Sequence, residues 1–195
     1  MLSMHRASRK EKGFTLTEAA IVLGIMGLIL GAIWVAAAAV YKNMRVSTTS
    51  NQLLQIAQSI RSMHATALTM DTSIAGTGGA LLLAKAGAIP KDMLDDALNP
   101  TVVRDVWTGL VTIDATTVTT AGDSFKVGFP NVPRDACVDL LVRNTGAGRD
   151  TGLVNAGAAV GQANTAMPLT VTTAVNTECT NSTANTVFFT FMLKS

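Results

Sequence analysis

Residues 13–40 read GFTLTEAAIVLGIMGLILGAIWVAAAAV, and this stretch decides the architecture that we expect for the rest of the chain. From Ala19 to Val40 it holds 22 residues without Asp, Glu, Lys, Arg or His. A helix of about 20 apolar residues, rising about 1.5 Å per residue, spans the hydrocarbon layer of a membrane. We therefore predict one membrane-spanning helix, with a single carboxylate, Glu18, directly before its apolar run.

The charges flanking this span are unevenly distributed. The first 13 residues contain four basic side chains and one acidic one, whereas the rest of the chain contains 11 basic and 12 acidic ones. An excess of Lys and Arg marks the cytoplasmic side of a span, which places residues after Tyr41 outside the cytoplasm. The basic balance of the chain belongs to its first residues, so nucleic-acid binding is not indicated.

The helical pattern continues beyond the apolar run, over residues 41–70. Apolar residues recur there at spacings of three and four, which predicts one continuous helix from about Leu16 to about Leu68 with an amphipathic second half. The members of this stripe are Leu53, Ile56, Ile60, Met63, Ala67 and Met70. We interpret the stripe as core that packs on the following domain; the alternative is a coiled coil with a separate partner.

Residues 71–195 have the composition of a mixed globular head. We expect Gly76–Gly79 to end the helical region, with a short helix at 80–86 and a helical turn from Pro90 to Leu98. Residues 145–166, rich in Gly, Ala, Asn and Thr, are predicted to form a long loop. β-Branched and aromatic runs predict strands at 110–113, 116–119, 124–129, 168–173 and 186–193, and Pro133–Asn144 predicts a helix. The expected fold class is α+β, a long N-terminal helix packed on an antiparallel sheet.

Cys137 and Cys179 are the two cysteines of the chain. Their separation fits no zinc motif, and both lie on the predicted outer side of the membrane, where conditions are oxidising. We predict a disulfide between them; the alternative is two free, buried thiols.

The junction around Gly13 resembles the leader cleavage site of the type IV prepilins. The matching residues are Gly13, Phe14, Thr15, Leu16 and Glu18, placed directly before an uncharged span. The run IVLGIMG at 21–27, the 182 residues after Gly13 and a span without proline resemble the type IVb subclass. Phe at the cleavage site is commoner in the type IVa subclass, and a 13-residue leader is intermediate in length.

This resemblance implies that residues 1–13 are a leader that a prepilin peptidase and N-methyltransferase removes after Gly13, methylating the new amine of Phe14. Residues 14–40 then form the transmembrane and filament-core helix. The precursor would sit in the bacterial inner membrane with its head outside the cytoplasm. Inner-membrane assembly machinery would polymerise it into a helical homo-oligomer, the extracellular pilus.

A pilus of this kind would serve adhesion, aggregation, motility, DNA transfer or conjugation. A minor pilin or a type II secretion pseudopilin is an alternative, because these share the same N-terminal pattern. A conventional secreted protein cut near Ala36–Ala39 and an uncleaved single-pass anchor carrying a periplasmic domain are remoter ones. The filament composition and the N-terminal residue separate these possibilities.

Glu18 has two interpretations. By resemblance it is the fifth mature residue, and its carboxylate would pair with the Phe14 ammonium of an adjacent subunit and set axial register during assembly. An unpaired charge in hydrocarbon costs several kcal/mol, so such pairing has a physical basis. Alternatively, Thr15 and Glu18 form a capping box that satisfies backbone donors at the start of the helix.

No residue pattern indicates catalysis. His5 and His64 are the only histidines, and Asp92, Asp95 and Asp96 are interpreted as a solvated helix face. We therefore expect no enzyme activity, no cofactor and no metal site.

Overall fold

The computed structural model describes residues 13–158 and 167–194 of the chain. Residues 1–12 of the expected leader, and most of the second half of the expected loop at 145–166, lie outside these ranges. The chain divides into two compact units, with the boundary between Tyr41 and Lys42. The helix α1 (Leu16–Met63) has residues in both units. Because α1 ends at Met63, it is about five residues shorter than the predicted helix.

In the first unit, the described residues form an exposed apolar helix. Within the described residues, α1 is the one helix long and apolar enough to cross a membrane. None of the residues in its most apolar window is buried. The side chains of Leu23, Leu28 and Trp34 are more than 70% exposed. A helix that is apolar on every side needs an apolar environment of its own.

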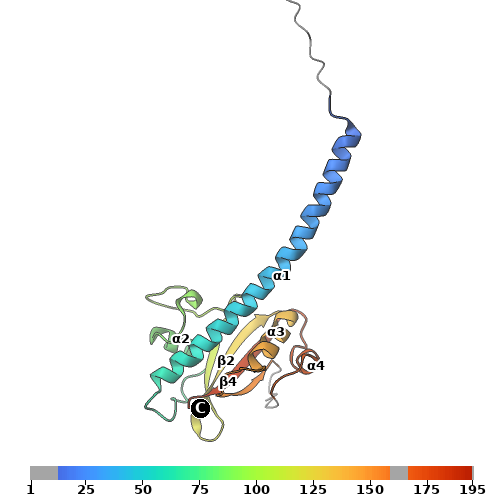
Figure 1. The fold of residues 1–195 in the computed structure, drawn as a ribbon. Coiled ribbons are helices and arrows are strands. Elements are labelled where there is room, and N and C mark those ends of the chain that lie inside the picture. The colour runs from blue at the N-terminus through green and yellow to red at the C-terminus, as the bar shows by residue number, and fades with distance from the viewer. Residues whose placement is uncertain (1–12, 159–166, 195) are drawn as a thin grey trace, which may run out of the picture. The chain divides into compact units, whose positions relative to one another are not determined.

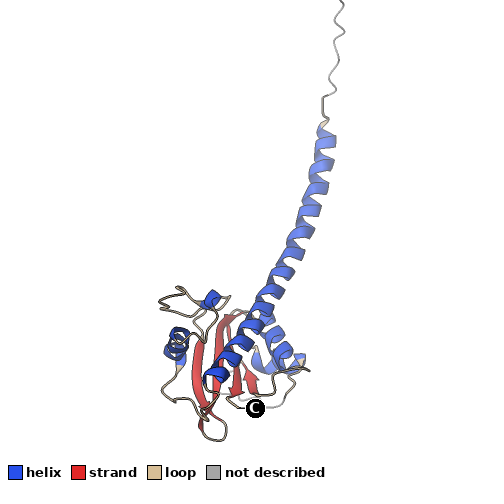
Figure 2. Ribbon diagram, turned by 60° about the vertical axis from the view of Figure 1, so that its left-hand side comes forward, coloured by secondary structure: helices blue, strands red, loops and turns tan. Residues whose placement is uncertain are grey.

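The second unit contains a four-stranded antiparallel sheet in the order β1-β2-β4-β3 (Figure 2). The strands are β1 (Thr112–Thr117), β2 (Ala121–Val132), β3 (Leu153–Gly157) and β4 (Asn185–Met192). The strand predicted at 186–193 is thus the interior strand β4. Its apolar composition follows from this position, because it has a neighbour on each edge.

The second half of α1 lies on one face of this sheet (Figures 1 and 2). The apolar stripe is buried where it meets the sheet: Leu53, Ile56 and Ile60 are at most 1% exposed. The same core contains four buried phenylalanines of β2 and β4, of which Phe125 and Phe191 stack with their ring centroids 5.7 Å apart. The stripe is therefore core of the head, and the coiled-coil alternative is wrong. Met63 is 43% exposed, because it is the last residue of the helix.

Short helices complete the head: α2 (Gly76–Lys85), the 3-10 turn η1 (Lys91–Met93), α3 (Arg134–Thr145), α4 (Val171–Thr173) and the π-helical turn η2 (Ala174–Glu178). Helix α2 contacts β1, whereas α4 and η2 contact one another and η2 contacts α3. In Figure 1, α2 and α4 consequently lie on opposite sides of α1.

Several expectations about the head are wrong. The strands predicted at 110–113 and 116–119 are one strand, β1. Gly76 does not end a helical region but begins α2, and Gly79 lies so close to the carbonyl of Ile113 that a Cβ would collide with it. The predicted loop at 145–166 contains β3, which pairs with β4. The strand predicted at 168–173 is absent, and its second half forms α4, because the Thr170 hydroxyl accepts a hydrogen bond from the Thr173 amide and caps a turn.

A disulfide joins Cys137 of α3 to Cys179, the residue after η2. Both cysteines are fully buried, and their Cα atoms are 6.0 Å apart. The bond fastens α3 to the segment that leads into β4, so it stabilises the part of the head farthest along the chain from α1.

Candidate functional site

The candidate site is the exposed start of α1. Residues 13–15 are not helical, and Thr15 precedes the first helical residue, Leu16. The Glu18 amide donates a hydrogen bond to Thr15 Oγ1 at 3.2 Å, and the Thr15 hydroxyl donates to Glu18 Oε2 at 3.2 Å. The Thr15 amide donates to the same oxygen at 3.5 Å. This is the reciprocal arrangement of a capping box, so the capping interpretation of Glu18 is confirmed.

Capping leaves part of the Glu18 carboxylate unused. Among the residues that the structure describes, the hydrogen bonds of this side chain go to Thr15 alone and involve only Oε2. An ionised carboxylate has about four lone-pair sites on two oxygens. Oε1 therefore has acceptor capacity for a second molecule while the cap is intact, and the two interpretations of Glu18 do not exclude each other.

The residues around the predicted cleavage bond are accessible. Gly13, Phe14 and Glu18 are all exposed, with Phe14 at 78%. Gly13 and Phe14 precede the capping residue Thr15 and are not helical, which suits entry of this bond into a peptidase site. The sequence-predicted residues Gly13, Phe14 and Glu18 thus lie within five residues of each other at one helix end.

The apolar helix that follows offers a face of small residues. Gly24, Gly27 and Gly31 are spaced by three and four, and a Cβ built on any of them would meet no atom within 4 Å. Small residues on an apolar helix permit another helix backbone to come close. The start of α1 is therefore suited chemically to helix–helix association with a carboxylate at one end.

The other residues considered in the sequence do not form a site. No group of three or more His, Cys, Asp or Glu able to hold a metal ion occurs in the described part of the chain. His64 Nδ1 lies 2.9 Å from the carbonyl of Ile60. Asp95 and Asp96 were expected on a solvated helix face, and this expectation is wrong. They lie in the loop after η1, where their carboxylates accept backbone hydrogen bonds.

Several charged residues that hold the head together were not identified from the sequence. Lys42 Nζ lies 2.9 Å from Asp139 of α3, and this contact raises the pKa of Lys42. Arg61 Nη1 lies 2.8 Å from Asp150, while Arg61 Nε donates to the carbonyl of Met192. Lys42 and Arg61 could have been identified as contacts to the head, because both lie in the amphipathic half of the predicted helix.

Asp105 is a buried carboxylate, 7% exposed. Its Oδ1 accepts hydrogen bonds from the amides of Trp107 and Gly109, at 2.9 and 2.7 Å, whereas Oδ2 is buried without a partner among the described residues. Burial raises the pKa of Asp105 to about 6, against the opposing effect of these two amides and of Arg45. The order Asp-Val-Trp-Thr-Gly is a turn signal that could have located this loop.

Comparisons with known proteins bear on both units. A family model described as PilS N terminal matches residues 43–192, and one described as the prokaryotic N-terminal methylation motif matches residues 8–34. No curated protein matches the chain.

Two of the solved structures similar to this chain come from Salmonella typhi. The crystal structure of a type IVb pilin is 23% identical, with a TM-score of 0.53 over 77% of this chain and 97% of that one. The NMR structure of the type IVb pilin PilS is 18% identical, with a TM-score of 0.47 over 75% of this chain and 95% of that one. The crystal structure therefore shares the fold of this chain over the matched residues.

Proposed function

Because the chain belongs to the pilin family described as PilS N terminal, we propose that it is a type IVb pilin, cleaved after Gly13, methylated at Phe14 and polymerised through α1 into an extracellular pilus. Membership of this family makes the chain a structural subunit of a pilus and not an enzyme. The match to the methylation motif implies processing by a prepilin peptidase, and the apolar helix implies a membrane-anchored precursor.

The proposed organisation follows from the two units. Residues 1–13 are the leader, 14–40 the transmembrane and filament-core helix, 41–70 the amphipathic half of the stalk, and 71–195 the head. The division of the chain between Tyr41 and Lys42 supports the boundary proposed at residue 40. In the precursor, the basic leader lies in the cytoplasm and the head lies beyond the inner membrane.

Cleavage creates the positive partner that Glu18 needs. Removal of residues 1–13 converts the Phe14 amide into a charged amine at the start of an apolar helix. In a bundle of such helices, an unpaired carboxylate and an unpaired ammonium each cost several kcal/mol, and pairing offsets part of that cost. Glu18 Oε1, which the cap leaves unused, would accept the ammonium of Phe14 from the adjacent subunit.

This pairing links processing to assembly. Before cleavage the amine is absent, so the precursor lacks the partner and remains in the membrane as a monomer. After cleavage, Glu18 of an incoming subunit is drawn to the amine of a subunit already docked, which sets the axial register of the two helices. The small face at Gly24, Gly27 and Gly31 then allows the apolar helices to pack closely.

The observation that carries the proposal is the uncommitted Glu18 oxygen within the segment that matches the methylation motif. The test is to purify filaments from cells that express the complete chain, image them by electron microscopy and determine the N-terminal residue of their bulk component. We expect N-methyl-Phe14. An end near Ala39 or Val40 would instead mean a secreted protein, and an intact Met1 an uncleaved anchor.

The same preparation separates the two kinds of pilin. If the chain is the bulk component of the filaments, it is a major pilin, and the filament it builds would act in adhesion, aggregation, motility, DNA transfer or conjugation. A trace amount in filaments of another protein would identify a minor pilin or a secretion pseudopilin.

A further inference from the structure

The segment between η2 and β4 contains a triplet that matches the acceptor pattern for N-linked glycans. Asn181, Ser182 and Thr183 fit the order Asn-x-Ser/Thr, in which the middle residue is not proline. All three residues are exposed. They follow the disulfide-bonded Cys179 and belong to the head, which the proposed topology places outside the cytoplasm. A bulky glycan attached there would extend into solvent without displacing core residues.

The main chain of Asn181 is held in place by a buried neighbour. Asn185, the first residue of β4, is 5% exposed. Its Oδ1 accepts a hydrogen bond from the Asn181 amide at 3.1 Å, and its Nδ2 donates to the Asn181 carbonyl at 2.8 Å. The same Nδ2 donates to the carbonyl of Val132 in β2 at 3.2 Å. The position of Asn181 therefore does not depend on its own side chain.

The side chain of Asn181 forms an Asx-turn with the residues that follow it. Asn181 Oδ1 accepts from the Thr183 amide at 3.0 Å, from the Thr183 hydroxyl at 3.2 Å and from the Ala184 amide at 3.3 Å. Backbone amides can only donate, so the atom that they contact is the oxygen of the side-chain amide. Within residues 13–158 and 167–194, Asn181 Nδ2 makes no hydrogen bond. This exposed nitrogen is available to an electrophile.

The contacts of Asn181 Oδ1 also favour reaction at Nδ2. An amide nitrogen is a weak nucleophile, because its lone pair is delocalised onto the carbonyl oxygen. When Nδ2 bonds to carbon and loses a proton, negative charge develops on Oδ1, and donors already directed at that oxygen stabilise the charge. The Thr183 hydroxyl is one of these donors. The geometry thus gives a physical reason for a hydroxyl residue at the third position of the triplet.

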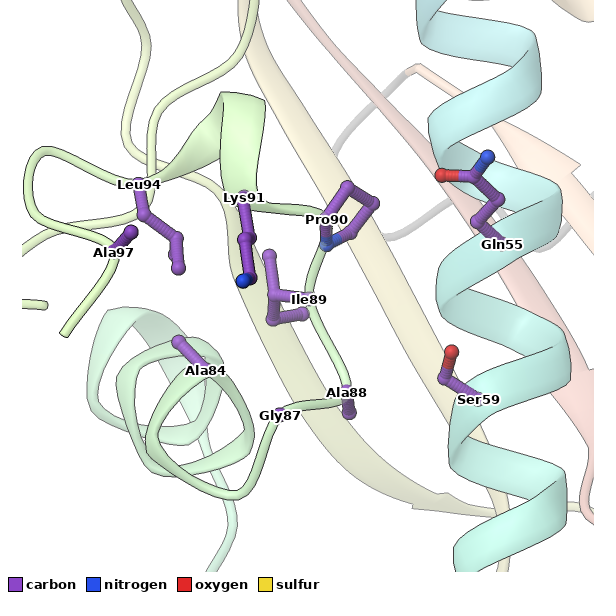
Figure 3. Close-up of a pocket in the computed structure, with 10 residues that line it drawn as sticks. All are labelled: Gln55, Ser59, Ala84, Gly87, Ala88, Ile89, Pro90, Lys91, Leu94 and Ala97. Atoms are coloured by element: carbon purple, nitrogen blue, oxygen red, sulfur yellow. The ribbon is translucent and has the colours of Figure 1, made fainter.

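A second triplet, at 99–101, has the same residue types at its ends but different contacts. Asn99 is exposed as well, yet the middle residue is Pro100. The amide and hydroxyl of Thr101 both donate to Asp95, and not to Asn99. This loop also supplies Ala97 to a pocket of about 300 Å³ beside α1 (Figure 3). Asn99 is therefore an internal control, an exposed asparagine of the same head without the Asx-turn.

We propose that Asn181 is an N-glycosylation site, which receives a glycan from a polyprenyl-pyrophosphate donor through a membrane-bound oligosaccharyltransferase. Asn181 Nδ2 forms a bond to the anomeric carbon of the first sugar, and the bond from that carbon to the pyrophosphate oxygen breaks. The lipid pyrophosphate leaves with the electron pair, and the Nδ2 proton passes to a base of the transferase. The inference rests on the proposed export of the head and adds a covalent modification to it.

The test is mass spectrometry of the complete chain, purified from the bacterium that encodes it. After reduction of the disulfide, cleavage behind Glu178 releases the peptide 179–195, and fragmentation of this peptide locates any added mass. We expect a mass of whole sugar units on Asn181. The peptide that contains Asn99 should be unmodified in the same sample.

Matched variants separate glycosylation from a merely structural turn. Thr183→Ser keeps the hydroxyl and should keep the added mass, whereas Thr183→Ala should lose it. Asn181→Gln should lose it as well, while Asn185 still holds the loop, and resistance to limited proteolysis would show that each head is folded. A bare Asn181 in the unaltered chain, sugars on Ser182 or Thr183, or an unchanged glycan in Thr183→Ala would overturn the proposal.

The N-terminal residue, determined on the same sample, separates this inference from the proposed processing. A chain that begins with N-methyl-Phe14 and carries no mass at Asn181 would overturn the glycosylation site alone. A glycan at Asn181 on a chain that keeps Met1 would support the site and count against cleavage after Gly13.

Discussion

Arg61 of α1 and Asp150, which precedes β3, form a partly buried ion pair with Nη1 and Oδ2 2.8 Å apart. The same guanidinium lies over the ring of Phe191, 5.5 Å from its centroid, and donates from Nε to the carbonyl of Met192. One side chain thus connects α1 to the edge strand β3 and the interior strand β4. This contact is a stability determinant of the head.

We predict that Asp150→Asn lowers the free energy of unfolding of the head by about 2 kcal/mol at neutral pH, the usual contribution of a charged hydrogen bond. The hydrogen bond from Arg61 holds the pKa of Asp150 below its ordinary value. The ion pair therefore stabilises the head fully above the pKa of Asp150 in the unfolded chain, near 4. This stabilisation is lost as the pH falls through the pKa of Asp150 in the folded head. Urea unfolding at pH 7 and at pH 2 measures both effects. An equal loss at the two pH values would show that the charge is not responsible.

The effect of Asp105 on the stability of the head should change with pH in the opposite direction. Its pKa is raised from 3.8 to about 6, so the folded head holds a proton that the unfolded chain releases between these values. Ionised Asp105 therefore destabilises the head at neutral pH, and the destabilisation disappears as the pH falls from about 7 to about 4. We predict that Asp105→Asn raises the free energy of unfolding at pH 7 by about 1 kcal/mol, after allowance for solvent screening.

The control for this prediction is Asp96→Asn, at an exposed carboxylate of the head. It should not reproduce the gain, since Asp96 incurs no such burial cost. Urea denaturation across pH 4 to 7 would test the pair. A variant at Asp105 that is less stable than the unaltered head at pH 7 would mean that its hydrogen bonds to the Trp107 and Gly109 amides need the charge.

Loss of the disulfide should affect the head alone. In the chain-entropy model, a loop of this length stabilises the folded state by about 4 kcal/mol. We predict that Cys137→Ser with Cys179→Ser leaves membrane insertion intact but makes the head sensitive to limited proteolysis. The unaltered chain in reducing buffer is the matched control, and unchanged protease resistance of the double variant would contradict the prediction.

Much of the fold was predictable because its strongest patterns are periodic or uninterrupted. The stripe at Leu53, Ile56 and Ile60 identified the buried face of α1, and the apolar run of residues 186–193 identified the interior strand β4. These signals depend on the sequence separation of residues along one element, which the chain itself specifies.

The errors concern elements whose structure depends on distant partners. Strand β3 is short and rich in small residues, and it is a strand because β4 offers a free edge. Residues 170–173 have β-branched side chains, yet the local cap at Thr170 starts a helix at Val171. At the site, the positions of Gly13, Phe14 and Glu18 were evident from the motif, whereas the use of only one Glu18 oxygen in the cap required side-chain geometry.

In the proposed mechanism, the charge of Glu18, and not its cap, drives assembly. Glu18→Gln keeps a side chain able to cap but removes the charge, whereas Thr15→Val removes the capping hydroxyl and keeps the charge. Both variants would be expressed as complete chains, with processing followed by mass spectrometry.

The decisive measurement is the amount of filament per cell, counted by electron microscopy and normalised to the processed chain. We predict that Glu18→Gln is cleaved after Gly13 but reduces filament yield at least tenfold, while Thr15→Val stays within about twofold of the unaltered chain. Normal filament yield from processed Glu18→Gln would contradict the account.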